Sequence, residues 1–299
     1  MSDNTLSSGL RRIPRRSEGI YATAWRSLMR NPLGKVGLGI LGMFIFTSLG
    51  APLIAPYDPI EIFAGDELLP PSFNYLLGTD ELGRDLLSRI LYGGRAAFAV
   101  GLLAVFLAFV VGALSGLIAG YVGGAVDAVV MRFWDMIMAF PPILLAVGVV
   151  AVLGPGAFQS AIALAIVNFP RFSRLARGGV LSEREKEYVM AARSIGASAA
   201  RILLRHILPN VLATLLVQFA LALVWAVLLE ATLSFLGLGT QPPNPSWGSM
   251  LRSSRSYLRI APWYALFPGA TISLLLLGLN LLVDAVRDAL DPTRARRLA

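Results

Sequence analysis

The sequence has no cysteine and a single histidine, His206. The chain therefore has no disulfide framework and no thiolate chemistry. It also cannot gather several histidines around a metal ion, so we expect no metal site. Charged residues are scarce, at 15% of 299 residues, whereas a soluble domain carries about a quarter. These shortages argue against a soluble enzyme.

Apolar residues, in contrast, make up 56% of the chain. They are concentrated in blocks near the length that a helix needs to cross roughly 30 Å of hydrocarbon. The net charge of +8 would suggest nucleic acid in a soluble protein. Here the basic residues cluster in alternate loops, as expected for a membrane protein whose cytoplasmic loops are basic. We predict an all-α integral membrane protein with lipid as its neighbour and no nucleic-acid partner.

The apolar pattern predicts six transmembrane helices. The expected division is a cytoplasmic arm (1–35), a first span (36–56), an external loop (57–95), a five-helix core (96–287) and a cytoplasmic tail (288–299). A polar segment at about 178–210 interrupts the core. The predicted spans are Val36–Pro56, Ala96–Gly120, one within Phe133–Leu153 that contains Pro141-Pro142, one from about Ala157, Val211–Phe235 and Trp263–Val286.

Loop charge sets the predicted orientation. Residues 171–205 carry eight Lys or Arg against three acids, and residues 57–95 carry seven acids against three Arg. Basic loops stay in the cytoplasm, so the first loop is expected inside and the second outside. The basic N-terminal arm also belongs inside, and an even number of crossings must separate it from the basic loop. The segment from Ala157 must therefore cross, and both termini are predicted to be cytoplasmic.

The polar segment between the fourth and fifth spans predicts two short helices around a turn. Acids in the first turn favour a helix from Glu183 to Ile195, and Gly196 suits a left-handed helix stop. Ser198 can cap a second helix that ends at Leu208 before Pro209. A pair of such helices, facing the cytoplasm, can transmit rigid-body motion from a partner.

This segment, from Glu187-Tyr-Val-Met-Ala-Ala-Arg-Ser-Ile-Gly-Ala-Ser to Leu208-Pro209-Asn210, resembles the EAA loop of ATP-driven importer permeases. Leu77-Gly-Thr-Asp-Glu-Leu-Gly-Arg-Asp-Leu-Leu-Ser-Arg, followed by Gly94-Arg95, is similar to a signature of the C-type permeases of dipeptide, oligopeptide and nickel importers. The similarity continues to Pro292. The resemblance implies a type I importer fold in which the loop contacts an ATPase. The residues it assigns to this contact are Glu187, Ala191, Ala192, Arg193, Gly196, Ala197 and Pro209.

The chain departs from the family at Met190, where an acid usually precedes the paired alanines; Glu187 lies one turn earlier.

The family resemblance implies an inner-membrane pore shared with a B-type permease. It also implies two ATP-binding subunits and an extracytoplasmic substrate-binding protein. The chain has no Gly-x-x-x-x-Gly-Lys-Ser/Thr phosphate loop, so ATP and Mg²⁺ belong to partner chains. We therefore expect no cofactor and no catalytic residue here. A short peptide is the expected substrate, with nickel as the next choice.

The external signature has two interpretations. Asp80, Arg84 and Asp85 have helical spacing and can pair locally, so the motif is either an ion-pair cluster that shapes the loop or a contact for the binding protein. The signature residues are Gly78, Thr79, Asp80, Gly83, Arg84 and Asp85.

Polar residues inside apolar runs are also candidates. Glu230, Asn168 and Asn280 either bond to neighbouring helices or line a substrate path. Gly112, Gly116 and Gly120 form a stripe that permits close helix packing, within one subunit or between subunits.

Two other classes are weaker alternatives. An ion-gradient-driven transporter or channel usually places ionisable groups at mid-membrane and pairs broken helices, and both features are sparse here. An intramembrane hydrolase needs an activated nucleophile, and the only histidine lies in the predicted cytoplasmic loop.

Overall fold

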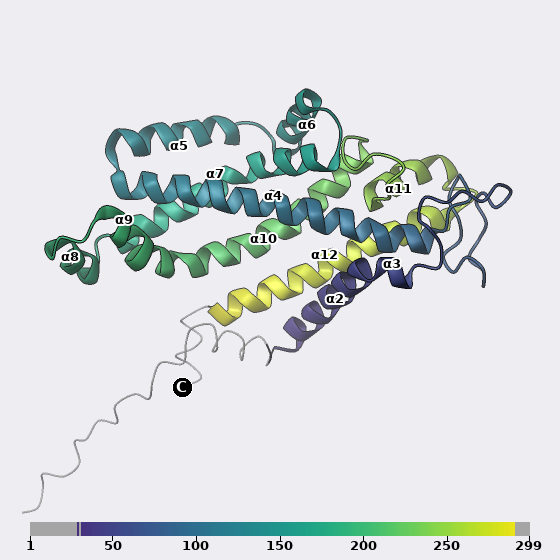
Figure 1. Ribbon diagram of the computed structural model, residues 1–299, viewed down its shortest axis with the longest axis horizontal. Coiled ribbons are helices and arrows are strands. Elements are labelled where there is room, and N and C mark those ends of the chain that lie inside the picture. Colours follow the sequence, from purple (N-terminus) through teal and green to yellow (C-terminus); the bar gives the residue numbers. More distant parts are fainter. Residues whose placement is uncertain (1–28, 30, 291–299) are drawn as a thin grey trace, which may run out of the picture.

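The computed structural model describes residue 29 and residues 31–290. Most of the predicted tail and most of the predicted N-terminal arm lie outside these residues. The described chain forms a long helical bundle (Figure 1). Helices α8 and α9 lie at one end of the bundle, and the loop before α4 lies with α11 at the opposite end. The two segments that the sequence singled out are therefore at opposite ends of the molecule.

The helices follow one another with short connections, apart from the loop between α3 and α4. In chain order they are α2 (Pro32–Leu49), α3 (Ala51–Ile54), α4 (Leu86–Val122), α5 (Gly124–Met138), α6 (Pro142–Leu153), α7 (Ala157–Glu183), α8 (Glu187–Ser194), α9 (Ala199–Arg201), a π segment η1 (Ile202–Ile207), α10 (Leu208–Phe235), α11 (Trp247–Ser254), a 3₁₀ turn η2 (Arg255–Tyr257) and α12 (Pro262–Leu290).

The glycine stripe of α4 packs against α7 within the same chain. A Cβ added to Gly116 would lie 2.0 Å from the carbonyl oxygen of Ser173, and one added to Gly112 would lie 2.6 Å from that of Phe169. Only glycine lets the two backbones approach this closely. The stripe therefore serves packing inside the subunit, the first of the two predicted alternatives.

The predicted third span is not one straight helix. Helices α5 and α6 meet at Pro141-Pro142 and are bent by 92°. Proline disfavours helical geometry in the residue before it, so a helix cannot run through the pair undisturbed. Pro142 instead opens α6, at a position where its missing N–H is not needed. The predicted third span is therefore bent at the proline pair that it was expected to contain.

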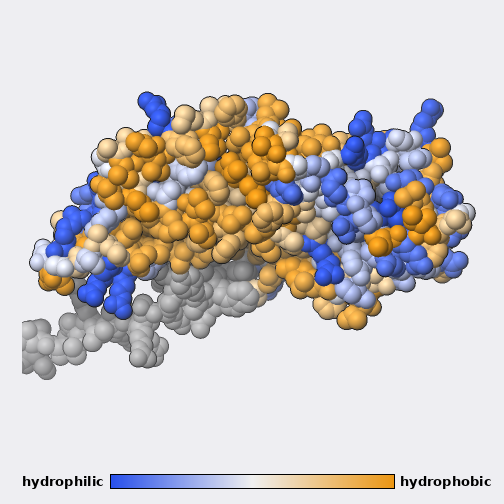
Figure 2. Space-filling view, turned by 45° about the horizontal axis from the view of Figure 1, so that its top comes forward, coloured by the Kyte–Doolittle hydropathy of each residue, from blue (hydrophilic) through white to orange (hydrophobic). Residues whose placement is uncertain are grey.

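Four helices of the described chain are long and apolar enough to span a membrane: α2, α4, the continuous α9–α10 stretch and α12. The bent pair α5–α6 makes up to five. Helix α7 is missing from this set because its second half carries Arg171, Arg174 and Arg177. Figure 2 shows a hydrophobic band between more hydrophilic ends. The structure thus supports a multi-pass helical protein, and six crossings remain a prediction.

Two predicted boundaries shift. Helix α4 begins at Leu86, so residues 86–95 of the predicted external loop are helical. The first span begins at Pro32, capped by the side chain of Asn31, and ends at Leu49 before a second short helix.

Candidate functional site

The predicted glycine turn of the polar segment at about 178–210, called the coupling segment below, is present. Helix α8 ends at Ser194, and Gly196 has a φ of 79°, in the left-handed region that glycine adopts most readily. The side chain of Ser198 then accepts a hydrogen bond from the backbone N–H of Arg201. Helix α8 begins at Glu187, four residues after the predicted start, because α7 extends to Glu183.

The second short helix does not end at Leu208. It continues through the π segment into α10, with Pro209 in the first turn of α10. The Leu208 N–H donates to the carbonyl of Leu203, five residues earlier, which is the π pattern. Proline lacks an N–H, and the π turn displaces the hydrogen-bond ladder just before it. The expectation of a helix stop at Pro209 was therefore wrong.

Helix α8 has one inward and one outward face. Val189 and Ala192 are buried and pack into a cluster that includes Ile202 and Ile207. Their spacing of three residues places both on the same face. Ala192, which the resemblance assigned to partner contact, therefore serves the permease's own packing.

The outward face of the coupling segment is apolar as well as charged. Ile195 is 86% exposed, and Met190 and Leu204 are about half exposed. Five of the predicted contact residues are exposed and one, Ala197, is half-buried; the exposed ones are Glu187, Ala191, Arg193, Gly196 and Pro209. Ile195 was not among the predicted contact residues, although its position next to the glycine turn was a signal for exposure.

A chain of polar contacts joins α8 to its neighbours. The Tyr188 hydroxyl donates to the carboxylate of Glu183, the last residue of α7. The Asn210 side chain, in the first turn of α10, donates to the Tyr188 oxygen at 3.1 Å and to the His206 carbonyl at 2.7 Å. Burial and the Glu183 carboxylate raise the pKa of Tyr188 to about 12, so its hydroxyl keeps its proton at neutral pH.

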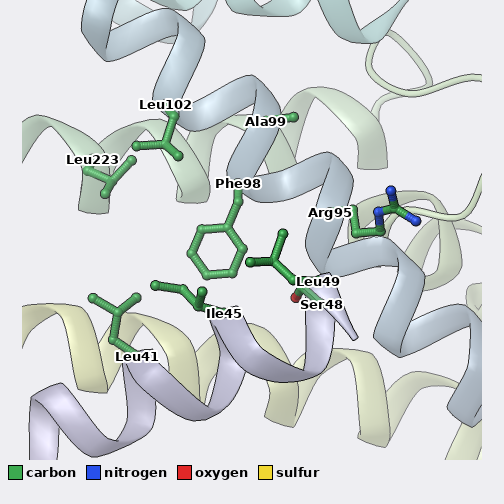
Figure 3. Close-up of a pocket in the computed structure, with 9 residues that line it drawn as sticks. All are labelled: Leu41, Ile45, Ser48, Leu49, Arg95, Phe98, Ala99, Leu102 and Leu223. Carbon is green, nitrogen blue, oxygen red and sulfur yellow. The ribbon is translucent and has the colours of Figure 1, made fainter. Parts of the chain in front are cut away.

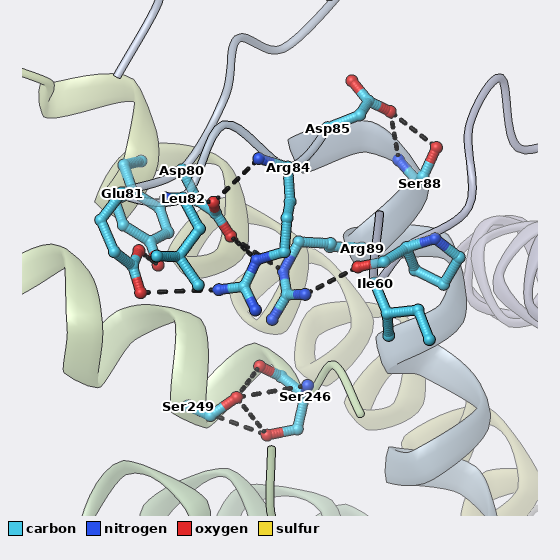
Figure 4. A network of polar contacts seen from close by, with 12 residues as sticks. Ile60, Asp80, Glu81, Leu82, Arg84, Asp85, Ser88, Arg89, Ser246 and Ser249 are labelled. Carbon is cyan, nitrogen blue, oxygen red and sulfur yellow. Dashed lines mark hydrogen bonds and ion pairs between the residues drawn. The ribbon is translucent and has the colours of Figure 1, made fainter. Parts of the chain in front are cut away.

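At the opposite end, Asp80 is the centre of a buried ionic cluster (Figure 4). Its carboxylate accepts from Arg84 Nε at 2.7 Å and lies 3.2 Å from Arg89 Nε. Asp80 is fully buried, and Arg84 and Arg89 are 8% and 5% exposed. Arg89 also donates to the carbonyl of Pro59 at 2.7 Å. The predicted pairing of Asp80 with Arg84 is present, and Arg89, which was not predicted as a site residue, completes the cluster.

Asp85 does not join this cluster. It caps α4, accepting from the backbone N–H of Ser88 at 2.8 Å and from the Ser88 hydroxyl at 2.7 Å. Thr79 bridges the loop: its hydroxyl donates to the carbonyl of Asp66 and accepts from the Leu69 N–H. The signature residues thus bond mainly to the loop itself and to the start of α4.

The two signature glycines allow close contacts and left-handed turns. Gly78 has a φ of 82°, and its added Cβ would lie 2.6 Å from the Leu69 carbonyl oxygen. Gly83 has a φ of 76°, and its Cβ would lie 2.2 Å from the Phe63 carbonyl oxygen. A side chain at either position would be strained and would clash with backbone.

The loop before α4 is also tied to α12, and α4 is tied to α11. The Tyr264 hydroxyl at the start of α12 donates to Glu81. Trp247, the first residue of α11, donates its indole N–H to the carbonyl of Ile90 in α4 at 2.9 Å. The first bond holds the loop against α12, and the second fixes α11 beside the start of α4.

The polar residues inside the helices differ in their surroundings. Glu230 is 1% exposed and accepts from Ser234, one turn further along α10, at 2.8 Å. Asn168 is buried and donates to Leu164 of its own helix, whereas Asn280 is exposed and donates to Leu276. The structure does not bring these three residues into one cluster of hydrogen bonds.

An apolar groove of about 460 Å³ lies between α2, α4 and α10 (Figure 3). Its only charged residue is Arg95 at one end. The rest of the lining comprises Leu41, Ile45, Ser48, Leu49, Phe98, Ala99, Leu102 and Leu223.

The helical, multi-pass architecture, with a polar coupling segment at one end, defines a membrane transport subunit. Residues 112–296 match the family described as binding-protein-dependent transport system inner membrane component, and residues 21–71 match the N-terminal membrane domain of oligopeptide transport permease C. The chain belongs to this family of permeases, in its oligopeptide permease C branch.

Similar proteins agree with this assignment. The chain is 46% identical over 272 residues to the dipeptide transport system permease protein DppC of Alkalihalophilus pseudofirmus, covering 91% of this chain and 90% of the relative. It is 45% identical to the di/tripeptide transport system permease protein DppC of Pseudomonas aeruginosa, covering 90% of each chain. It is 42% identical to the glutathione transport system permease protein GsiD of Pectobacterium atrosepticum, covering 90% of this chain and 91% of that one.

An inward-facing structure of the MetNI methionine ABC transporter shares the fold, with a TM-score of 0.55, 18% identity and coverage of 67% of this chain and 96% of that chain. The protein is thus an inner membrane permease subunit of an ABC importer, is not itself catalytic, and works within a larger complex. The gradient-driven transporter considered from sequence is set aside by this family membership.

Proposed function

We propose that this permease translocates short peptides, with dipeptides as the main substrate. The observation that supports this class is the 46% identity, over nine-tenths of the chain, with a permease named for dipeptide transport. The other relatives compared are named for di- or tripeptides and for glutathione, which is itself a short peptide. Nickel, the second choice from sequence, has no such support.

The coupling segment is the proposed docking site for the ATP-binding subunits. Its support is the outward apolar surface of Met190, Ile195 and Leu204 beside the charged Glu187 and Arg193. Exposed apolar side chains rimmed by charge suit a protein partner. The inward face of α8 is anchored on Ile202 and Ile207, so a displacement of α8 reaches the helices behind it.

The complete assembly would contain a B-type permease, two ATP-binding subunits and an extracytoplasmic binding protein. In this arrangement the chain crosses six times with both termini in the cytoplasm. Helix α7 supplies the sixth crossing, since its 27 residues extend about 40 Å. Its Arg171, Arg174 and Arg177 then lie near the cytoplasmic surface, where long side chains reach water.

Uptake of a labelled dipeptide tests the substrate class. Cells that lack this chain should lose the uptake and regain it when the chain is supplied. Unlabelled di- and tripeptides should compete, whereas nickel and free amino acids should not. A protonophore should leave the uptake intact while cellular ATP is maintained. Unchanged dipeptide uptake together with lost nickel uptake would contradict the proposal.

A further inference from the structure

Two physical routes lead from α8 to α10. The first follows the backbone through Gly196, the short α9 and the π segment Ile202–Ile207. The second is the hydrogen bond between the Tyr188 oxygen and the Asn210 side chain, which joins residues 22 positions apart at 3.1 Å. The second route bypasses the whole loop.

The backbone route is compliant. Gly196 has a left-handed φ, nothing would lie within 4 Å of its added Cβ, and Ile195 beside it is exposed. The π segment that follows is an uncommon helical form, often found at functional sites. A displacement of α8 can therefore be absorbed along this path before it reaches α10.

The apolar contact beneath α8 does not remove this compliance. Val189 and Ala192 pack against Ile202 and Ile207, which belong to the π segment itself. Apolar contact is also non-directional, so it resists separation of the helices more than it fixes their register. The Tyr188 contact differs because Asn210 lies beyond the π segment, in the first turn of α10.

Tyr188 also holds the end of α7. Its hydroxyl donates to Glu183, and Lys186 donates to the same carboxylate at 2.5 Å. The Asn210 side chain in turn donates to the His206 carbonyl at 2.7 Å, which fixes the amide toward Tyr188. A hydrogen bond with a charged partner is stronger than a neutral one, so Tyr188 is oriented by its strongest contact.

We propose that Tyr188 is the positioning residue that carries the displacement of α8 directly to α7 and α10, through Glu183 and Asn210. This inference rests on the proposed docking of the ATP-binding subunits at α8. Helix α10 then runs without a break from Leu208 to Phe235, so motion delivered at Asn210 is transmitted as a rigid body toward the opposite end of the bundle.

The test is the ratio of peptide transported to ATP hydrolysed, measured on the complete complex reconstituted in lipid vesicles. Tyr188→Phe removes only the hydroxyl. We expect transport per ATP to fall about five- to tenfold, as the loss of one typical hydrogen bond would give. ATP hydrolysis and the amount of bound ATPase should stay at the wild-type level.

Asn210→Ala sharpens the test because it breaks the same link from the other side. Asn210→Ala leaves the Glu183 contact in place, so its loss should not exceed that of Tyr188→Phe, and the double variant should lose no more than Tyr188→Phe alone. Tyr121→Phe is the matched control: its hydroxyl makes no hydrogen bond among the described residues, so the ratio should not change.

An unchanged ratio in Tyr188→Phe would overturn the proposal, and so would losses that add in the double variant. Dissociation of the ATPase from Tyr188→Phe would also overturn it, because Tyr188 would then serve docking. The underlying docking hypothesis is tested separately with the wild-type chain. It fails if no ATP-binding subunit purifies with that chain.

Discussion

The two ends of the bundle use charge in opposite ways. At the end that holds the loop before α4, Asp80 is fully buried, and the buried Arg84 and Arg89 both pair with its carboxylate. At the coupling end, charged side chains such as Glu187 and Arg193 face outward beside Ile195, which is 86% exposed.

This difference separates structural from partner-facing motifs. Both segments are rich in charge, and both drew attention in the sequence for that reason. A charge that is satisfied inside its own chain contributes little to a contact with another protein. We therefore propose that the signature before α4 supports its own loop and that the coupling segment presents a surface to a partner.

The largest effect on this comparison is expected from removing Asp80, the central residue of the buried ionic cluster. Asp80→Ala would leave Arg84 and Arg89 buried without their carboxylate. Loss of one partner from a buried pair costs about 3–5 kcal/mol of folding free energy. We expect the thermal unfolding midpoint of the purified permease to fall by about 10 °C.

Glu61→Ala is the matched control, because it removes an exposed carboxylate from the same loop. It should leave the midpoint within the error of the measurement. If Asp80→Ala were equally harmless, while binding of the extracytoplasmic partner was lost, the cluster would be a contact surface and the comparison would fail.

A smaller effect is expected at the coupling end. Ile195→Glu places a charge on the most exposed apolar side chain of the segment. We expect recovery of the ATP-binding subunits with the tagged permease to fall about tenfold, which corresponds to about 1.4 kcal/mol. The unfolding midpoint of the permease alone should not change, because Ile195 makes few contacts within the chain.

Ala192→Glu gives the opposite pattern and sharpens the distinction. Ala192 is 6% exposed and lies in the cluster with Ile202, so a carboxylate there is buried and unpaired. The unfolding midpoint of the permease should fall. Too little folded permease should then remain for docking to be measured. Equal effects of the two substitutions on stability would mean that α8 has no distinct inward and outward faces.

Local patterns in the sequence were sufficient for much of this architecture. The length of the apolar blocks indicated a helical membrane protein, Gly196 indicated the turn and Ser198 the cap. The spacing of Asp80 and Arg84 indicated their pairing. Each of these features depends on residues within a few positions of one another, which is the range over which periodicity and capping rules apply.

The features that the sequence did not reveal depend on distant contacts. Arg89 pairs with Asp80 and is also held by the carbonyl of Pro59, 30 residues away, and Tyr188 meets Asn210 across the loop. The inward face of α8 is decided by Ile202 and Ile207 from a different segment. The continuous helix through Pro209 depends on a π turn, which local propensity does not signal.

The smallest predicted effect concerns Glu230, on the helix that connects the two ends. Ser234 donates to its carboxylate at 2.8 Å and accepts from the Thr240 N–H at 3.3 Å, so it ties the end of α10 to the following loop. Ser234→Ala should cost about 1 kcal/mol, the typical net contribution of a hydrogen bond to stability. Thr232→Val, on the exposed side of α10, should cost less because its hydroxyl bonds only to Leu228 in its own helix.

If Glu230 is an anchor, Ser234→Ala lowers the unfolding midpoint slightly and leaves dipeptide uptake unchanged. Altered uptake at an unchanged midpoint would instead place Glu230 on the substrate path and give α10 a binding role.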